Sequence, residues 1–343
     1  MAYTPIDKST DYFNTKLYSG TGAIQTVSGV GFEPSWIWTK SRTNLGNNQV
    51  TDQVRGLTKY IRTNANNAED TKTNAVTAVN SDGFVLGADS SNDINASGQT
   101  YASWNWKANG QGSANTDGSI NTTYTSVDTT SGFSISTYTG TGSAGTIGHG
   151  LGAIPSVVLV KKTSAAEDWV MYHKSLGNGK NMRFNTNEVA DTSSAPWNAT
   201  TPTSSAFSVG ASTLTNGSSI NYIAYCFAEV QGFSKVGSYT GNANVDGGFI
   251  YTGFKPAWVL IKNTAANESW FLYDNKRGYN GSMAALFPNE TAADAFANNI
   301  DLLSNGFKLK TAGAILNSNA TFIYTAFAAA PLVGSNNVPA NAR

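Results

Sequence analysis

Histidine is the side chain that most often transfers protons near neutral pH, and the chain has two. His149 lies in the glycine-rich stretch Gly148-His-Gly-Leu-Gly152, and His173 follows Tyr172 at the end of a short apolar run. A zinc site needs three or four converging ligands, and a serine hydrolase needs a histidine oriented by a carboxylate. Neither histidine has such companions nearby in the sequence. We therefore expect no catalytic residue, no metal and no cofactor, and we interpret both histidines as hydrogen-bonded structural groups.

Two acid–base pairs recur with one spacing. Asp52 and Arg55 precede a glycine, as do Asp274 and Arg277. A glycosidase needs two carboxyl groups that flank a cleft, whereas each of these pairs joins an acid to a base. We predict that both are ion pairs that fix a loop; contact with a ligand is the alternative.

Two tryptophans lie in polar surroundings and are candidates for ligand contact. Trp197 belongs to the polar loop 192–202, and Trp270 follows the polar segment 263–269. An exposed aromatic ring beside amide and hydroxyl groups can stack on a sugar. Our candidate glycan-binding residues are therefore Trp197, Asn198 and Trp270. The commoner alternative for such tryptophans is a buried ring that anchors its loop.

Composition excludes several classes of function. Charged residues make up 13% of the 343 residues, aromatic residues make up 11%, and the formal net charge is zero. A binder of nucleic acid normally carries a basic excess, so we expect no nucleic-acid partner. No stretch approaches the ~18 apolar residues of a membrane span, and the N-terminus lacks the apolar region of a signal peptide. The single Cys226, in the apolar run 222–228, excludes an intrachain disulfide and is expected to be buried.

Internal repeats determine the organisation that we predict. A Gly-x-x-Pro step leads into an apolar run ending in lysine three times, and the prolines, Pro34, Pro155 and Pro256, are 121 and 101 residues apart. Runs with spaced aromatic residues begin at Tyr101, Tyr222 and Phe322, which are 121 and 100 residues apart. Landmarks at both ends thus keep nearly the same offset. We predict three homologous units at residues 1–108, 119–231 and 232–333, joined by a flexible Gly/Asn/Ser-rich linker at 109–118 and followed by an extended tail at 334–343.

Short runs that alternate apolar and polar residues, separated by Asn-Gly and Asp-Gly turns, predict strands and hairpins. The continuous apolar run Ser156–Lys161 is typical of a strand covered on both faces. Helical periodicity is limited to 290–300, where we expect one or two turns. The predicted fold is all-β, with three tandem antiparallel β-sandwich units of jelly-roll type and little helix.

Strings of sequence in all three units resemble a repeat of virion proteins from tailed, especially marine, bacteriophages. The matching strings include Asp11–Tyr18, Trp36–Arg42, Asp52–Gly56, Ser81–Phe84, Tyr101–Lys107, Gly148–Pro155, Tyr222–Glu229, Gly232–Tyr239 and Val338–Arg343. The resemblance covers essentially the whole chain. It implies a non-enzymatic virion structural protein made in the host cytoplasm, and it supplies no catalytic residues.

The resemblance leaves three functions open. The favoured one is a subunit of a tail fibre or other appendage that attaches to a host surface glycan or protein. Such a subunit would form a homotrimer and would also contact other virion proteins. A capsid decoration, head fibre or tail-body protein without a receptor role is the alternative, because the chain opens almost directly with its first unit rather than with a docking domain. A tailspike that depolymerises glycans is the third, disfavoured by the absence of paired acids at shared positions.

Overall fold

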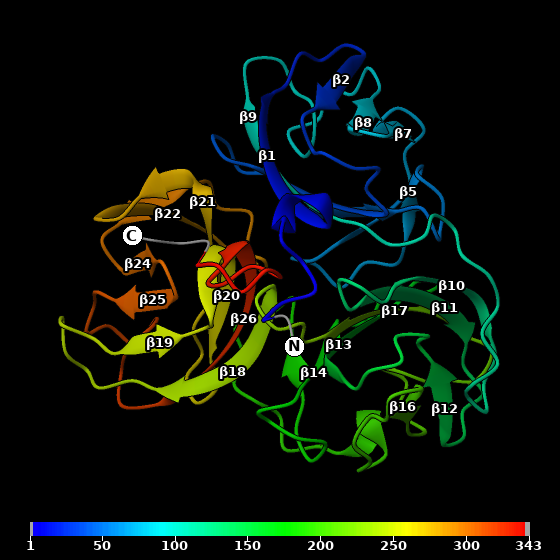
Figure 1. Ribbon diagram of the computed structural model, residues 1–343. Coiled ribbons are helices and arrows are strands. Elements are labelled where there is room, and N and C mark those ends of the chain that lie inside the picture. The colour runs from blue at the N-terminus through cyan, green and yellow to red at the C-terminus, as the bar shows by residue number, and fades with distance from the viewer. Residues whose placement is uncertain (1–2, 340–343) are drawn as a thin grey trace.

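The computed structural model describes residues 3–339, and this part of the chain is built almost entirely from strands (Figure 1). Its helical elements are two short 3₁₀ turns, η1 (Ser9–Asp11) and η2 (Ala195–Trp197). No helix in the described residues is long and apolar enough to cross a membrane. The all-β prediction is therefore confirmed.

Three large antiparallel sheets of six strands each form the body of the molecule. The first contains β1 (Phe13–Ser19), β9 (Thr100–Trp106), β3 (Trp36–Ser41), β4 (Gln49–Asp52), β5 (Lys59–Arg62) and β6 (Asp70–Thr71), in that spatial order. The second contains β10 (Thr122–Asp128), β11 (Phe133–Thr139), β17 (Asn221–Ala228), β13 (Pro155–Lys162), β14 (Val170–His173) and β15 (Met182–Arg183). The third contains β18 (Ser234–Thr240), β26 (Thr321–Pro331), β20 (Phe254–Asn263), β21 (Phe271–Tyr279), β22 (Ser282–Leu286) and β23 (Ala295–Ala297).

A small sheet accompanies each large one. The three small sheets are β2 (Gln25–Ser28), β8 (Gly83–Leu86) and β7 (Val76–Asn80); β12 (Gly145–Gly148) and β16 (Ala206–Val209); and β19 (Phe249–Tyr251), β25 (Gly306–Leu309) and β24 (Ile300–Leu303). Each pair of sheets encloses its own apolar core. The two layers are unequal, with six strands facing two or three, which differs from the even layers of a jelly roll.

The strand order of the large sheets recurs. β1, β11 and β18 each pair with the strand that closes its segment, namely β9, β17 and β26, and this strand pairs in turn with β3, β13 or β20. The second sheet alone carries an extra outer strand, β10, beside β11. The predicted three-unit organisation thus corresponds to one strand order that is used three times.

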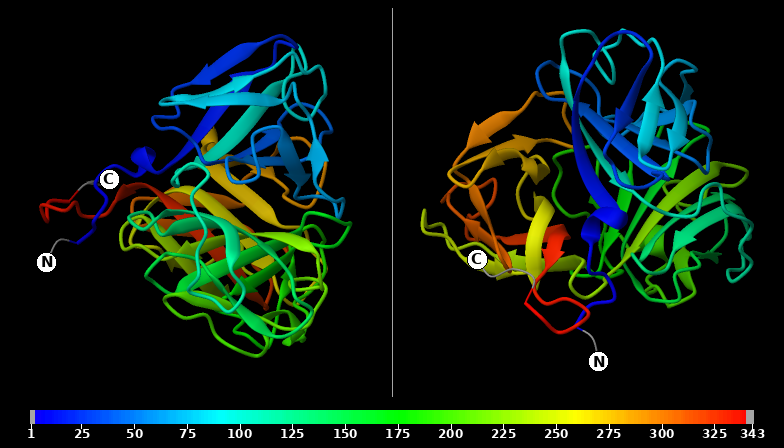
Figure 2. Two further views of the ribbon diagram at one scale, coloured as in Figure 1. Left: turned by 90° about the vertical axis from the view of Figure 1, so that its right-hand side faces the viewer. Right: turned by 45° about the horizontal axis from the view of Figure 1, so that its top comes forward.

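The three large sheets pack around a common centre (Figures 1 and 2), and their inward faces form one aromatic core. The ring of Trp106 is 1% exposed and lies 5.7 Å from that of Trp258 and 6.2 Å from that of Phe227, so it contacts all three sheets. A small cavity of about 30 Å³ at this centre is lined by apolar side chains and by Thr325. It is too small and too apolar to hold a polar ligand.

Strand β13 shows why a strand of a large sheet appears in the sequence as a continuous apolar run. All eight of its residues are buried. Val158 and Val160 face the core that the second sheet shares with its small sheet, and Val157 and Leu159 face the common centre. The prediction of a strand covered on both faces is confirmed.

The helix predicted at 290–300 is wrong. This segment contains β23 and leads into β24, where Ile300 and Leu302 are buried and their neighbours are half-exposed. Residues 295–297 pair with β22 of the third large sheet and residues 300–303 pair with β25 of its small sheet, and these ladders outweigh the helix propensity of the alanines.

The segments expected to be a free linker and an extended tail are both held by hydrogen bonds. In 109–118, Ser113 pairs with Thr125 on β10. Residues 334–339 turn back, because the N–H of Gly334 donates to the oxygen of Val338 and that of Ser335 to Asp7. The predicted linker thus pairs with β10 at Ser113, and its flexibility stays a prediction. The tail turns back rather than being extended over 334–339, and 340–343 lie outside the described residues.

The shared core predicts that a cavity made at the centre destabilises the whole chain. Trp106→Ala should lower the free energy of unfolding by about 3–5 kcal/mol, the range for an aromatic deleted from a core. Chemical denaturation followed by fluorescence and by circular dichroism measures this loss. The control is Tyr279→Ala, whose side chain is 73% exposed and should change stability by less than about 0.5 kcal/mol. A small loss for Trp106→Ala, or a transition confined to part of the signal, contradicts the shared core.

Candidate functional site

The two candidate tryptophans do not reach the surface. Trp197 is 2% exposed and packs edge-on against Tyr172, with ring centroids 5.9 Å apart. Trp270 is 2% exposed, and its Nε1–H donates to the backbone oxygen of Arg183 at 3.0 Å. A buried ring cannot stack on a sugar from solvent, so the stacking role is wrong for both. Each ring instead anchors its loop, because Trp197 packs into the core of the second sheet pair and Trp270 into the common core.

Asn198 remains at the surface, in a left-handed conformation with φ of 50°. It lines an open hollow of about 590 Å³ whose other walls are small residues, among them Ala195, Ala199 and Gly210. The hollow has no aromatic or charged wall. Asn198 is therefore accessible to solvent, but the two tryptophans that were predicted to bind a glycan beside it are buried.

The two acid–base pairs are present as buried ion pairs. Arg55 Nη2 lies 2.6 Å from Asp52 Oδ2, and Arg277 Nε lies 2.6 Å from Asp274 Oδ2. Burial alone would lower the pKa of each arginine, but the adjacent carboxylate outweighs it and raises the pKa. Glu69 is a second acid for Arg55. The pairs fix the turns after β4 and within β21, as predicted for a structural role.

The same carboxylates also join neighbouring sheets. Asp52 accepts a hydrogen bond from the Tyr225 hydroxyl of the second sheet at 2.8 Å, and Asp274 accepts one from Trp104 Nε1–H of the first sheet at 2.9 Å. The corresponding position of the second sheet is His173, whose Nε2 lies 3.2 Å from the backbone oxygen of Tyr324 in the third. At this position, each large sheet thus makes a buried polar contact with the next.

Both histidines are buried and hydrogen-bonded. His173 Nδ1 accepts from the N–H of Ser175, which leaves Nε2 as the donor to Tyr324. His149 Nδ1 accepts from the N–H of Leu151, and its Nε2 lies 3.2 Å from the oxygen of Thr203. Burial lowers the pKa of His173 to about 4 and lowers that of His149. Both rings are therefore neutral at pH 7.

Three fully buried lysines cap the loops of neighbouring sheets, a role that the sequence analysis did not assign. Each ends the apolar strand after the repeated proline, and its Nζ donates to the next residue's oxygen and to a loop of another sheet. The inter-sheet bonds are Lys40 to Thr291 (3.0 Å), Lys161 to Asn66 (3.3 Å) and Lys262 to Asn187 (3.2 Å). Burial lowers the pKa of each lysine to about 8. The sequence feature that could have indicated this role is the recurrence of lysine at the same position of each repeat.

Three buried asparagines, also unassigned, tie each glycine-rich turn to the loop before the closing strand. Asn95, Asn216 and Asn317 are 121 and 101 residues apart. The side-chain oxygen of Asn95 accepts from the N–H of Thr21, and its amide donates to the oxygens of Ala23 and Gly87. Asn216 and Asn317 make the same three kinds of bond.

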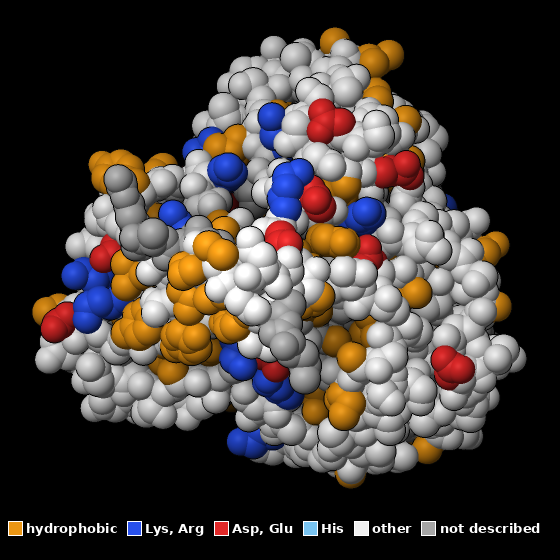
Figure 3. All heavy atoms as spheres, in the orientation of Figure 1, with side chains coloured by type: hydrophobic (Ala, Val, Ile, Leu, Met, Phe, Trp, Pro, Cys, Tyr) orange, Lys and Arg blue, Asp and Glu red, His pale blue; other side chains and the backbone are white. Residues whose placement is uncertain are grey.

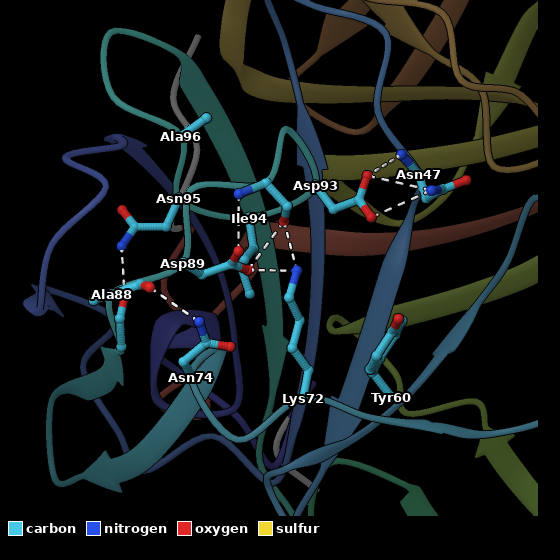
Figure 4. A network of polar contacts seen from close by, with 12 residues as sticks. Asn47, Tyr60, Lys72, Asn74, Ala88, Asp89, Asp93, Ile94, Asn95 and Ala96 are labelled. Atoms are coloured by element: carbon cyan, nitrogen blue, oxygen red, sulfur yellow. Dashed lines mark hydrogen bonds and ion pairs between the residues drawn. The ribbon is translucent and has the colours of Figure 1, made fainter.

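The loop around Asn95 carries two carboxylates, Asp89 and Asp93 (Figure 4). Asp89 pairs with Lys72 at 2.8 Å, and Asp93 accepts hydrogen bonds from the backbone and side chain of Asn47. Both acids are thus engaged by structural partners. Within residues 3–339 no three His, Cys, Asp or Glu side chains converge as metal ligands would.

An aromatic hollow lies on the surface beside the N-terminal segment, and we call it the tyrosine hollow. Its volume is about 490 Å³, and its walls include Tyr3, Tyr251, Glu229, Lys235, Gln231 and Ser234. Hydrophobic side chains gather over β19 on this face (Figure 3), where Phe249 and Tyr251 are 46% and 53% exposed. The hydroxyl of Tyr3 donates to the oxygen of Gly253 at 3.0 Å. Sequence reasoning missed the hollow because its walls come from three separate segments.

The carboxylate in the wall of the tyrosine hollow is paired with lysines. Glu229 forms ion pairs with Lys174 and Lys235 and accepts from the N–H of Val236 at 2.8 Å. Burial alone would raise the pKa of Glu229, but the hydrogen bond from Lys174 lowers it overall. Burial and the contact with Tyr251 raise the pKa of Tyr3 to about 12. The hollow therefore presents two tyrosine rings beside a carboxylate that is paired with lysine, which suits a ligand with hydroxyl groups.

Removing one lysine cap should leave a buried oxygen with one donor fewer. Lys161→Met keeps much of the side-chain volume but removes the lysine donor from the oxygens of Lys162 and Asn66, of which Asn66 still accepts from the N–H of Glu167, and the expected cost is about 1–3 kcal/mol. Urea unfolding measures the difference. The matched control is Lys255→Met, at an exposed lysine of the third sheet. Equal stabilities of the two variants would contradict the capping role.

The contact of His173 should weaken in acid. Its pKa is lower in the folded chain, about 4, than its ordinary value of 6.5, so the unfolded chain takes up the proton first. The free energy of unfolding should therefore fall as pH drops from 6.5 toward 4. In His173→Gln, which keeps a donor for Tyr324, this fall should be shallower. Unfolding curves at several pH values for both proteins measure the slopes, and identical slopes would refute the assignment.

Comparisons with known proteins give a single relationship. No curated protein and no solved structure matches the chain significantly. One family model matches residues 8–331, which span all three large sheets. Because this match covers more than half of the chain, the protein belongs to the family described as a domain of unknown function, DUF7483.

Proposed function

We propose that this protein is a non-enzymatic structural component of a tailed-bacteriophage virion that contributes to attachment to the host surface, and that a host glycan binds in the tyrosine hollow. The resemblance of the repeat strings supports the virion assignment. The hollow supports attachment, because aromatic faces beside hydroxyl, amide and backbone groups are the surface that a sugar ring needs.

The tyrosine hollow is the observation that carries this proposal. Trp197 and Trp270, the rings first considered for sugar contact, are buried. Tyr251 is 53% exposed, and Gln231 and Ser234 place an amide and a hydroxyl in the same wall. The pocket around Asn198 lacks an aromatic wall, so it is the weaker candidate.

The common core bears on the assembly that we propose. In a threefold fibre made of identical subunits, each subunit buries an apolar face against the other two. Here the inward faces of three large sheets are already covered within one chain. We therefore propose that the protein is a monomer whose three large sheets take the places of the three subunits of a trimer. This replaces the homotrimer expected from the resemblance. Analytical ultracentrifugation should give a mass near 36.1 kDa; a mass three times larger would overturn this part.

A capsid or tail-body protein without a receptor role is the second candidate. The observation that favours it is the rigid junction of the three large sheets, in which ion pairs and lysines serve contacts within the chain. Cryo-electron microscopy of the virion distinguishes the two. Density projecting from the tail supports attachment, and density on the capsid lattice supports decoration.

Loss of one ring should weaken binding to host cells without changing stability. Tyr251→Ala should reduce the affinity of the purified protein for host cells about tenfold, which corresponds to ~1.4 kcal/mol. Flow cytometry of fluorescently labelled protein on host cells measures this. Tyr279→Ala removes a more exposed tyrosine outside the hollow and is the matched control. Equal binding of both variants, or no saturable binding by the unmodified protein, would refute attachment through this hollow.

A further inference from the structure

The tyrosine hollow has more positive than negative charge around its one carboxylate. Lys174, in the turn after β14, donates to Oε2 of Glu229, and Nζ of Lys235 on β18 lies 3.4 Å from Oε1. Among the described residues that line the hollow, Glu229 is the sole acid. Two lysines thus share one carboxylate, and one positive charge is left without a counterpart.

Lys235 is the lysine that Glu229 needs least. Oε2 of Glu229 accepts from Lys174, and Oε1 accepts from the N–H of Val236 at 2.8 Å. The contact with Lys235 is longer than the roughly 2.7–2.9 Å of a charge-assisted hydrogen bond. The Lys235 side chain is also 42% exposed and lines the hollow. Its ammonium group is therefore within reach of a second anion that enters from solvent.

The hollow places this ammonium group beside an aromatic ring. Lys235 and Tyr251 are both in its wall, together with the exposed Gln231. On this face of the molecule, basic and acidic side chains adjoin the hydrophobic cluster (Figure 3). The volume of about 490 Å³ lies within the roughly 300–1,000 Å³ of small-molecule sites, so one sugar ring can enter.

We propose that the tyrosine hollow selects a sugar that carries one negative charge, a uronic acid or a sulfate ester. The face of the ring packs on Tyr251, and the anionic group pairs with Lys235. This inference rests on the proposed binding of a glycan in the hollow, and it adds the class of sugar.

The single charge follows from the charge count. One anionic group compensates the one lysine that Glu229 leaves over. A phosphate monoester carries about 1.5 to 2 negative charges at pH 7, and the surplus would lie beside the Glu229 carboxylate. A neutral sugar would leave the ammonium group of Lys235 without a second partner.

The probes are the methyl glycosides of glucose, galactose and mannose, each with its uronic acid and its 6-sulfate. Titrations of the full chain followed by saturation-transfer NMR give the dissociation constants. In at least one configuration an acidic form should bind about fivefold more tightly than the neutral form at low salt, as expected for one exposed ion pair. The difference should vanish at about 1 M salt, where the Debye length is about 3 Å. The tighter of the two acidic forms identifies the anionic group.

Variants of Lys235 test whether its charge is the cause. Lys235→Met should lower the affinity for the acidic sugar to that for the neutral one and leave the neutral one within about twofold. Lys235→Arg should keep the preference. Lys180→Met removes an exposed lysine outside the hollow and is the matched control. A preference that persists in Lys235→Met would overturn the proposal. If Lys235→Met does not fold, the salt dependence of the unmodified protein decides.

The outcomes separate this inference from the proposed function. Tyr251→Ala should weaken the binding of acidic and neutral sugars alike. Equal affinities of acidic and neutral sugars, both reduced in Tyr251→Ala, would overturn the charge preference and leave glycan binding in the hollow intact. No binding of any of these sugars at millimolar concentration would overturn both.

Discussion

The structure depends on one constraint: each large sheet is apolar on both faces, and its own small sheet can cover only one of them. The other face must be buried against the remaining two large sheets, and this produces the common aromatic core around Trp106. Burying the ends of these strands also buries polar groups, which must then be paired. Lys40, Lys161 and Lys262 meet that need by capping a loop of another sheet. The buried ion pairs meet it by accepting from Tyr225 and Trp104.

Function is therefore to be sought where the three copies differ. Positions with equivalent roles, such as the lysines and asparagines, hold the body together. The departures lie at the periphery: an added strand on the second sheet, and a glutamate cap and the exposed Tyr251 on the third. Because several charged groups are used inside the body, the surface is comparatively rich in Asn, Ser, Thr and Gly.

Much of the fold could be predicted from the sequence, because strand alternation and the repeat offsets are local or periodic signals. The all-β class, the buried strand at Pro155–Lys162, the buried Cys226 and the positions of the acid–base pairs follow from such signals. The sites were harder to predict. Trp197 and Trp270 lie among polar neighbours, yet packing from distant segments buries them. The tyrosine hollow joins Tyr3 to Tyr251 across 248 positions, and no local pattern indicates that contact. The turn of the tail could not be predicted either, because it is fixed by a hydrogen bond from Ser335 to Asp7, which lies at the other end of the chain.

Differential scanning calorimetry of the intact chain tests the shared core most directly. If the three large sheets stabilise one another, the chain unfolds in one transition whose calorimetric and van't Hoff enthalpies agree. Separable transitions, or a calorimetric enthalpy two to three times the van't Hoff value, would show that the sheets are independent domains and would contradict the account.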